Sequence, residues 1–196
     1  MTDAIRAKYT RAELTMIPMA QWPMDETGTT LYDTARAATD ALSDEEKMDI
    51  YRDLVKKDQE KSYVPSTHFC LRDINGDGIT DLLLSEDGIK FSDAYTIFNG
   101  KAGAFRTWSS MYLCEGGFIE THGTSSQGEG HTYYSLDEYG MHYLENIYWS
   151  YYPEAFYYEA PGVKDHEIPR EEFDRILDGY TRMEVEMTPI DQFPAK

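Results

Sequence analysis

The sequence predicts an α+β fold in which an antiparallel β-meander sheet is packed by N-terminal and C-terminal helices. Three observations predict it. A helix-start pattern at Ser43 opens an amphipathic segment. After Pro65, short apolar runs alternate with turn-forming residues, as in strands joined by hairpins. Beyond Pro169, apolar residues recur at helical spacing. Helix, meander and helix in this order favour helices that cover one face of an antiparallel sheet.

The helical segments carry capping and spacing signals. Residues 31–42 are alanine-rich and predict a first helix. Ser43 followed by Glu46 forms a capping box, which opens a second helix expected to end near Asp58. The C-terminal helix follows Pro169, a residue that fits a first helical turn. Its apolar stripe consists of Phe173, Ile176, Leu177 and Tyr180.

Strands are expected between Pro65 and Trp149, because β-branched and aromatic runs there are separated by turn residues. Asn99-Gly100 marks a turn, and Gly123 to Gly130 is expected to be a Gly/Ser loop. The expected strands are His68 to Ile74, Ile79 to Ser85, Asp93 to Phe98, Ala104 to Leu113, Phe118 to Thr121, Thr132 to Leu136 and Met141 to Trp149.

The length of 196 residues suits one domain with an extension. Residues 1–42 are expected to form an N-terminal lead-in and helix, because Pro18, Pro23 and Gly28 interrupt any periodicity there. Residues 43–196 are expected to form a single α+β domain. Its aspartate-rich segment occurs once, which excludes a propeller of repeats.

That aspartate-rich segment, residues 73–81, has the spacing D-x-N-x-D-G-x-x-D. Oxygen-bearing side chains stand at positions one, three, five and nine, and Gly78 stands at position six, where a calcium loop turns sharply. Calcium takes six to eight oxygen ligands, including backbone carbonyls. The predicted Ca2+ ligands are the side chains of Asp73, Asn75, Asp77 and Asp81 and the carbonyl of Ile79.

A polar β-turn without metal is the alternative, because Asn-Gly and Asp-Gly are also strong hairpin signals. A bare turn does not explain why Asp73 and Asp81 stand at ligand spacing. The loop also differs from a helical EF-hand. Position twelve is Leu84 in place of a bidentate glutamate, and the flanking runs are strand-like.

With these flanks, the segment from His68 to Asp87 resembles the EF-hand-like calcium loops of integrin-type FG-GAP repeats and related bacterial surface domains. In those proteins a β-loop-β hairpin replaces the two helices of the EF-hand. Carried over position by position, the resemblance implies that Asp73, Asn75, Asp77 and Asp81 supply the side-chain ligands.

A wider resemblance rests on three pieces of sequence: Phe69-Cys70-Leu71-Arg72-Asp73, Tyr95-Thr96-Ile97-Phe98-Asn99-Gly100 and Ile168-Pro169-Arg170-Glu171-Glu172-Phe173-Asp174. Together with the Tyr-rich meander they are similar to uncharacterised domains of secreted or lipid-anchored proteins of Gram-positive gut bacteria. The resemblance implies an α+β fold and a place outside the cell. It implies no catalytic activity.

The chain is strongly acidic, with 18 Lys and Arg against 36 Asp and Glu and a net charge of −18. This charge repels phosphate backbones and anionic lipids, so nucleic acid is not an expected partner. Membrane insertion is not expected, because no apolar run approaches the ~20 residues of a membrane span. A calcium loop of modest ligand charge suits millimolar calcium, which favours an extracellular or cell-surface location.

The two cysteines, Cys70 and Cys114, permit one disulfide in a secreted protein, and free buried thiols are the favoured reading. Their separation and the absence of clustered histidines near them exclude a zinc site built on cysteine.

A tyrosine-rich tract near the C-terminal end has two interpretations. An exposed aromatic ridge is a stacking platform for a glycan or protein ligand. Alternatively, the residues alternate along strands, with one face in the core. The tract comprises Tyr143, Tyr148, Trp149, Tyr151, Tyr152, Phe156, Tyr157 and Tyr158.

Residues 122–131 carry a weaker catalytic pattern. His122 and His131 bracket the Gly/Ser loop, and a hydrolase would pair Ser125 or Ser126 with a histidine and an acid such as Glu129. No nucleophile-elbow pattern is present, and a flexible hairpin tip is the favoured interpretation.

The leading hypothesis is a non-enzymatic, calcium-stabilised domain of a bacterial secreted or surface protein that acts as a binding or spacer module. The alternative is a hydrolase of glycans or peptides that uses the loop 122–131. A histidine beside Ser125 would favour the hydrolase.

Overall fold

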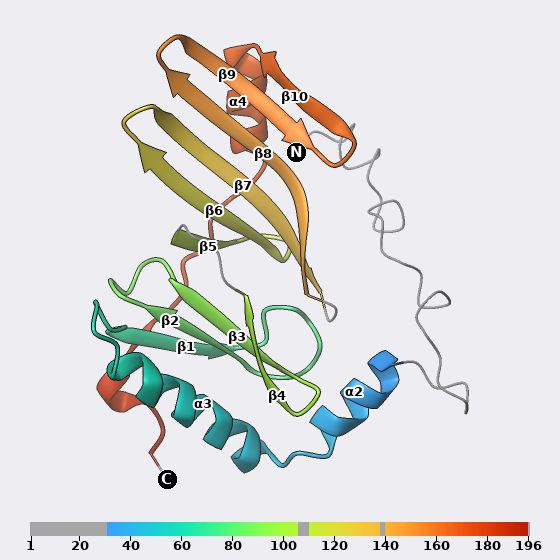
Figure 1. Cartoon of the computed structure of the whole chain (residues 1–196), viewed down its shortest axis with the longest axis vertical. Helices are drawn as coiled ribbons and strands as arrows, with labels where there is room; N and C mark the ends of the chain where they lie inside the picture. The colour runs from blue at the N-terminus through green and yellow to red at the C-terminus, as the bar shows by residue number, and fades with distance from the viewer. Residues whose placement is uncertain (1–30, 106–109, 138–139, 196) are drawn as a thin grey trace.

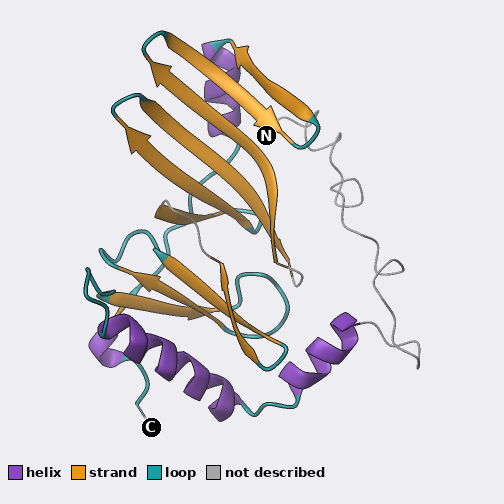
Figure 2. Ribbon diagram, viewed as in Figure 1, coloured by secondary structure: helices purple, strands orange, loops and turns teal. Residues whose placement is uncertain are grey.

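The strands of this chain form two antiparallel sheets, and a few helices lie against them (Figures 1 and 2). The computed structural model describes residues 31–105, 110–137 and 140–195. The predicted α+β class with antiparallel sheets is confirmed. The prediction of one meander sheet is wrong, because the strands divide between a five-stranded and a six-stranded sheet.

The five-stranded sheet contains the predicted calcium loop and has the order β11-β1-β2-β3-β4. The chain returns to this sheet at its C-terminal end, where β11 pairs with β1 and leads into the short 3-10 helix η2 (Ile190–Gln192). The strands are β1 (His68–Arg72), β2 (Asp81–Ser85), β3 (Asp93–Phe98), β4 (Lys101–Phe105) and β11 (Thr188–Pro189).

The six-stranded sheet follows chain order from β10 to β5, so each strand pairs with the one next to it in sequence. Its two longest strands, β7 and β8, continue past the residues expected of them. The strands are β5 (Ser110–Cys114), β6 (Phe118–Ser125), β7 (Gly128–Asp137), β8 (Gly140–Tyr151), β9 (Glu154–Ala160) and β10 (Val163–Ile168).

Two strand predictions need correction. The single strand expected over Ala104 to Leu113 is two strands, because β4 pairs with β3 in one sheet and β5 pairs with β6 in the other. The expected loop over Gly123 to Gly130 is mostly strand, since Gly123 pairs with Gly130 and Ser125 with Gly128 across the β6–β7 hairpin. Cross-strand pairing has overridden the low strand propensity of glycine and serine there.

The helices lie where capping and spacing predict them. They are α2 (Leu31–Asp40), α3 (Asp44–Gln59) and α4 (Arg170–Leu177). The capping box of α3 is present: the Ser43 hydroxyl accepts a hydrogen bond from the Glu46 amide, and the Glu46 carboxylate accepts one from the Ser43 amide. The predicted lead-in over residues 1–30 lies outside the described residues.

Three apolar clusters hold the layers together, and β2 contributes to two of them. Leu83 faces the six-stranded sheet, whereas Leu82 and Leu84 face the opposite way, toward α3, as alternation along a strand requires. This arrangement explains why β2 is apolar at three consecutive positions. The cluster with α3 includes Tyr51, Val55, Phe69, Ile79 and Ile97, and the cluster between the sheets includes Phe91, Ala94, Met111 and Ile119.

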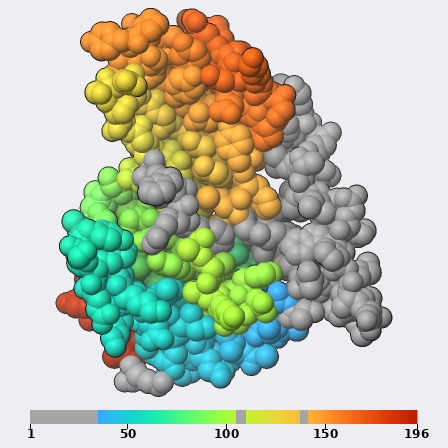
Figure 3. All heavy atoms as spheres, viewed as in Figure 1, coloured from blue at the N-terminus to red at the C-terminus, as the bar shows by residue number. Residues whose placement is uncertain are grey.

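The third cluster lies between the six-stranded sheet and α4. It includes Tyr133, Ile147, Ile168, Phe173 and Ile176. In the space-filling view, the six-stranded sheet and α4 make up the upper part of the molecule, and the five-stranded sheet with α2 and α3 makes up the lower part (Figure 3). Among the described helices, none combines the length and the apolar character needed to cross a membrane.

Cys70 and Cys114 are both free thiols. Cys70 packs against the cluster between the sheets, and Cys114 belongs to the cluster under α4. Burial raises the pKa of both thiols, that of Cys114 to about 12. Both cysteines are therefore free, as the favoured reading expects, but only Cys114 is buried and Cys70 is partly buried.

Candidate metal centre

The aspartate-rich loop is closed by the pairing of β1 with β2. Arg72, the last residue of β1, stands opposite Asp81, the first residue of β2. Asp73 follows β1 directly, so the two ends of the loop meet at the edge of this pair. Antiparallel register therefore brings together the first and last predicted ligands, which are far apart in a linear reading of the motif.

The first ligand position folds the loop around one carboxylate. Asp73 Oδ1 accepts a hydrogen bond of 2.7 Å from the Gly76 amide, and Asp73 Oδ2 accepts one of 2.9 Å from the Gly78 amide. Gly78 has a φ of +80°, which L side chains rarely adopt. This explains why position six of the motif is glycine.

The middle positions form a second set of local contacts. The Asp77 amide donates to Asn75 Oδ1 at 3.2 Å, and the Ile79 amide donates to Asp77 Oδ1 at 2.7 Å. Asn75 Nδ2 also donates to Asp77 Oδ2 at 3.2 Å. The Asn75 and Asp77 side-chain oxygens are thus held within one turn of backbone.

Asp81 is the most unusual residue of the loop. It is 0% exposed, and its Oδ2 accepts a hydrogen bond of 2.9 Å from the Ile74 amide. Its Oδ1 is buried and has no hydrogen-bond partner among the described residues. The Thr96 hydroxyl lies near enough to lower the pKa of Asp81, but Thr96 Oγ1 and Asp81 Oδ1 form no hydrogen bond of good geometry with each other. A buried carboxylate oxygen without a partner is costly.

The environment of the loop disfavours the ionised form of its buried carboxylates. Burial, together with the nearby carboxylates of Asp77 and Asp73, raises the pKa of Asp81 to about 7. Burial and the Asp73 carboxylate likewise raise the pKa of Asp77. Ionising all three carboxylates in this loop therefore costs free energy that a cation would offset.

The hydrophobic core supports the loop from behind. The Ile79 side chain is buried in the cluster with α3, and the Tyr51 hydroxyl on α3 donates a hydrogen bond of 2.7 Å to the Thr80 carbonyl. The structure therefore places the four predicted side-chain ligands in one loop, which Ile79 and Thr80 connect to α3.

The comparisons with known proteins identify no relative. No protein family, no curated protein and no solved structure matches this chain. The function must therefore be argued from the residues themselves.

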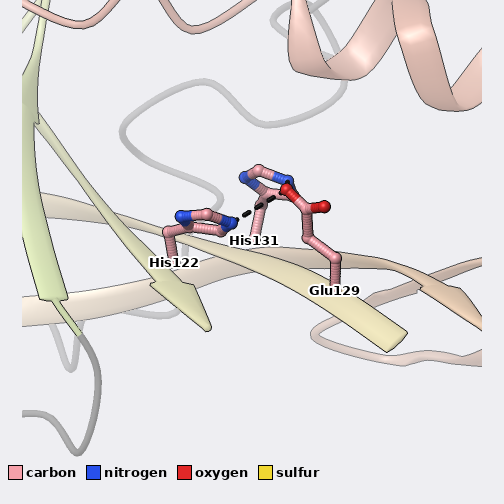
Figure 4. Close-up of side chains that lie close together, drawn as sticks. All are labelled: His122, Glu129 and His131. Carbon is pink, nitrogen blue, oxygen red and sulfur yellow. Dashed lines mark hydrogen bonds and ion pairs between the residues drawn. The ribbon is translucent and has the colours of Figure 1, made fainter. Parts of the chain in front are cut away.

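The two histidines of the weaker catalytic pattern meet in the structure. His122 on β6 and His131 on β7 are cross-strand partners, and their rings stack with centroids 4.7 Å apart. Glu129, two residues before His131 and on the same face of β7, accepts a hydrogen bond from His122 at 2.9 Å (Figure 4). The interpretation as a flexible hairpin tip is corrected, because paired strands hold these side chains.

Ser125 takes no part in this histidine pair. Its hydroxyl donates to the Gly128 carbonyl and accepts from the Gln127 amide, so it closes its own turn. A serine hydrolase needs the hydroxyl beside a general base. The geometry of residues 122–131 thus offers no support to a serine nucleophile at position 125.

Two residues beside this cluster were not predicted from the sequence to contribute to it. Glu120 is 1% exposed and accepts hydrogen bonds from both Arg182, at 2.6 and 2.7 Å, and His131 Nδ1, at 2.7 Å. Arg182 also stacks over the Tyr112 ring. Alternation along β6 places Glu120 on the face of His122, but Arg182 comes from a segment beyond α4, which only the tertiary fold reveals.

The aromatic tract divides between the two faces of the β8–β9 pair. Trp149, Phe156 and Tyr158 pack against the cluster under α4. On the other face, Tyr148 stacks on Tyr157 with centroids 4.6 Å apart, and its hydroxyl donates to Asp165. Strand alternation therefore places three of the eight residues of the tract against the core, and Tyr148 and Tyr157 remain partly exposed.

Proposed function

We propose that residues 73–81 bind one Ca2+ and that the ion stabilises a domain of a secreted or cell-surface bacterial protein. The observation that carries this proposal is the buried Oδ1 of Asp81, which has no hydrogen-bond partner in the described part of the chain and stands in a loop with two further carboxylates. A divalent cation supplies the missing partner and offsets the repulsion at once.

The donor set favours calcium over other cations. Asp73, Asn75, Asp77 and Asp81 offer only oxygen, and the Ile79 carbonyl would add a backbone ligand. Each carboxylate oxygen that already accepts an amide proton retains a further lone pair. Hard oxygen ligands in a flexible loop suit Ca2+, whereas Mg2+ demands a near-ideal octahedron and keeps its water.

The expected role of the ion is structural, because the loop joins strands that carry much of the core. β2 packs against α3 on one face and toward the second sheet on the other. An ion that ties Asp73 to Asp81 would thus stabilise the β1–β2 pair directly. We also propose that the helices cover the sheets, as the sequence predicts. The contacts of Tyr51 on α3 and Phe173 on α4 with sheet residues support this arrangement.

The proposed cellular role is that of a binding or spacer module outside the cell. Millimolar extracellular calcium would keep a loop of this ligand charge occupied. The partly exposed pair Tyr148 and Tyr157 is the proposed contact for a glycan or protein partner. A glycan array without signal would reject the glycan form of this proposal.

Replacement of Asp77 with alanine tests the calcium site. In about 10 mM calcium, the variant is expected to melt roughly 3–10 °C below the wild type, because it loses about 1.5–2.5 kcal/mol of ligand stabilisation. In EDTA the two proteins are expected to melt within about 2 °C of each other, because the lost hydrogen bond to Ile79 is offset by relief of charge repulsion. Circular dichroism melts in both buffers measure this.

Asp87→Ala is the matched control. Asp87 also accepts backbone hydrogen bonds in a tight turn, from the Ile89 and Lys90 amides, but it lies outside the loop. Its replacement is expected to lower the melting temperature equally in calcium and in EDTA. Equal losses for Asp77→Ala in the two buffers would contradict a calcium site.

A further inference from the structure

A second cluster of potential ligands lies on the β6–β7 hairpin, and it differs in chemistry from the aspartate loop. Glu129 Oε1 lies 2.9 Å from His122 Nε2 and 3.4 Å from His131 Nε2, and the three ligand atoms lie within 4.8 Å of one another. Figure 4 shows both imidazole rings beside the Glu129 carboxylate. Ligands of a tetrahedral zinc ion, at about 2.0–2.1 Å from the metal, lie roughly 3.3–3.4 Å apart. The two distances to Glu129 are near that value, and the two histidine nitrogens, which lie within 4.8 Å of each other, would move together on a shared ion.

The surroundings of His131 prepare its Nε2 for a metal. Glu120 Oε1 lies 2.7 Å from His131 Nδ1, and the Glu120 carboxylate is itself held by two hydrogen bonds from Arg182. A carboxylate at Nδ1 favours the tautomer with the proton on that nitrogen, which leaves the Nε2 lone pair free. In metal sites, the imidazole that binds the ion is usually oriented by such a carboxylate at its other nitrogen.

One side of the cluster is open to solvent. His131 is buried, with 6% of its side chain exposed, whereas the side chains of His122 and Glu129 are 23% and 30% exposed. The two rings are nearly parallel, at 13°, so the lone pairs of their ring nitrogens lie in nearly parallel planes. His122 would ligate through Nε2 in the tautomer that carries its proton on Nδ1 instead of donating it to Glu129. His122 is the ring with room to tilt toward a shared ion, because it lies at the open side.

We propose that His122, Glu129 and His131 bind a transition-metal cation of the zinc type, with an open fourth position for water or an exogenous ligand. Two imidazoles and one carboxylate are a common ligand set of zinc sites with an open position, and imidazole nitrogen is a poor ligand for calcium. This inference is independent of the calcium loop, with which the cluster shares no residue.

The test uses the metal-free full chain, prepared with EDTA and then dialysed. The wild type is expected to bind one Zn2+ in titration calorimetry and to give a cobalt(II) absorption spectrum typical of four-coordinate sites. Loss of a group that only orients a ligand typically weakens metal binding roughly 10–100-fold. His122→Gln and Glu129→Gln each remove a ligand itself, so each is expected to weaken zinc binding by more than that. Both residues are partly exposed, and melts of the metal-free variants show whether they fold.

Two controls separate this site from other binding. His166→Gln removes a histidine from the exposed part of β10, and Asp81→Asn alters only the aspartate loop. Both are expected to bind zinc as the wild type does. A wild type that shows neither zinc heat nor a cobalt spectrum would overturn the proposal, as would equal zinc affinity in the wild type and both ligand variants. In those cases the cluster is a hydrogen-bonded histidine pair only.

Discussion

Replacing Glu120 with alanine is expected to lower the free energy of unfolding by about 3 kcal/mol, and the melting temperature by roughly 6–12 °C. Glu120 is buried between Arg182 and His131 and accepts three hydrogen bonds from them. Its loss leaves the buried His131 Nδ1 without a partner, whereas Arg182, with 40% of its side chain exposed, can turn to water. Urea unfolding measures the difference.

The lowered pKa of the Glu120 carboxylate predicts that the protein loses stability in acid. Burial raises the pKa of Glu120, but the hydrogen bonds and charges of Arg182 and His131 outweigh it and lower the pKa to about 2. The stabilisation is therefore complete above the pKa of the unfolded chain, near 4.5, and is lost as the pH falls from there to about 2. Glu120→Gln is expected to remove this part of the pH dependence.

Glu172→Ala is the matched control for Glu120. Glu172 forms an exposed ion pair with Arg175 on α4, and such pairs contribute little. Its replacement is expected to change the free energy of unfolding by less than about 0.5 kcal/mol. A Glu120→Ala variant as stable as this control would show that the buried network does not hold the C-terminal segment to the sheet.

Asp81→Asn is expected to stabilise the metal-free protein at pH 8, by an amount on the order of 4 kcal/mol at most. Burial, with repulsion from Asp77 and Asp73, raises the pKa of Asp81 to about 7. The folded chain therefore holds a proton that the unfolded chain releases, and stability falls as the pH rises from about 4 to 7. Asparagine removes this ionisation and retains an oxygen for the Ile74 amide.

Melts in EDTA at pH 5 and pH 8 measure this effect. At pH 5 the gap between the variant and the wild type is expected to be less than half of the gap at pH 8, because the wild type has then lost only part of the stability that it loses between about pH 4 and pH 7. With calcium at pH 8 the advantage of the variant is expected to shrink, since the ion stabilises the wild type more than a variant whose ligand set is weakened. A variant less stable than the wild type in EDTA at pH 8 would contradict the account of Asp81.

Local signals predicted the elements that depend on neighbours in sequence. The capping box at Ser43 and the apolar stripe behind Pro169 correctly predicted α3 and α4, because caps and helical spacing act within a few residues. The strands beside the aspartate loop were also predicted from local signals, namely apolar runs bounded by turn residues. Their pairing then brings Asp73 and Asp81 together without any further information.

Features that depend on distant partners were not predicted. The apolar pattern of Ala104 to Leu113 suits a strand in either sheet, so it cannot show that the chain changes sheet there. The glycines of residues 123–130 disfavour a strand locally, yet the β7–β8 pairing stabilises one. Arg182 stands 62 residues beyond Glu120, on a segment that follows α4, so no local pattern pairs the two residues.

Calcium titration calorimetry of the metal-free wild type, with magnesium titrated in parallel, tests the central claim most directly. The account predicts one calcium site with a dissociation constant of roughly 0.1–1 mM, and far weaker heat with magnesium. No calcium heat at millimolar concentration, or equal heat from both ions, would contradict it. The loop 73–81 would then be a β-turn with a buried carboxyl group.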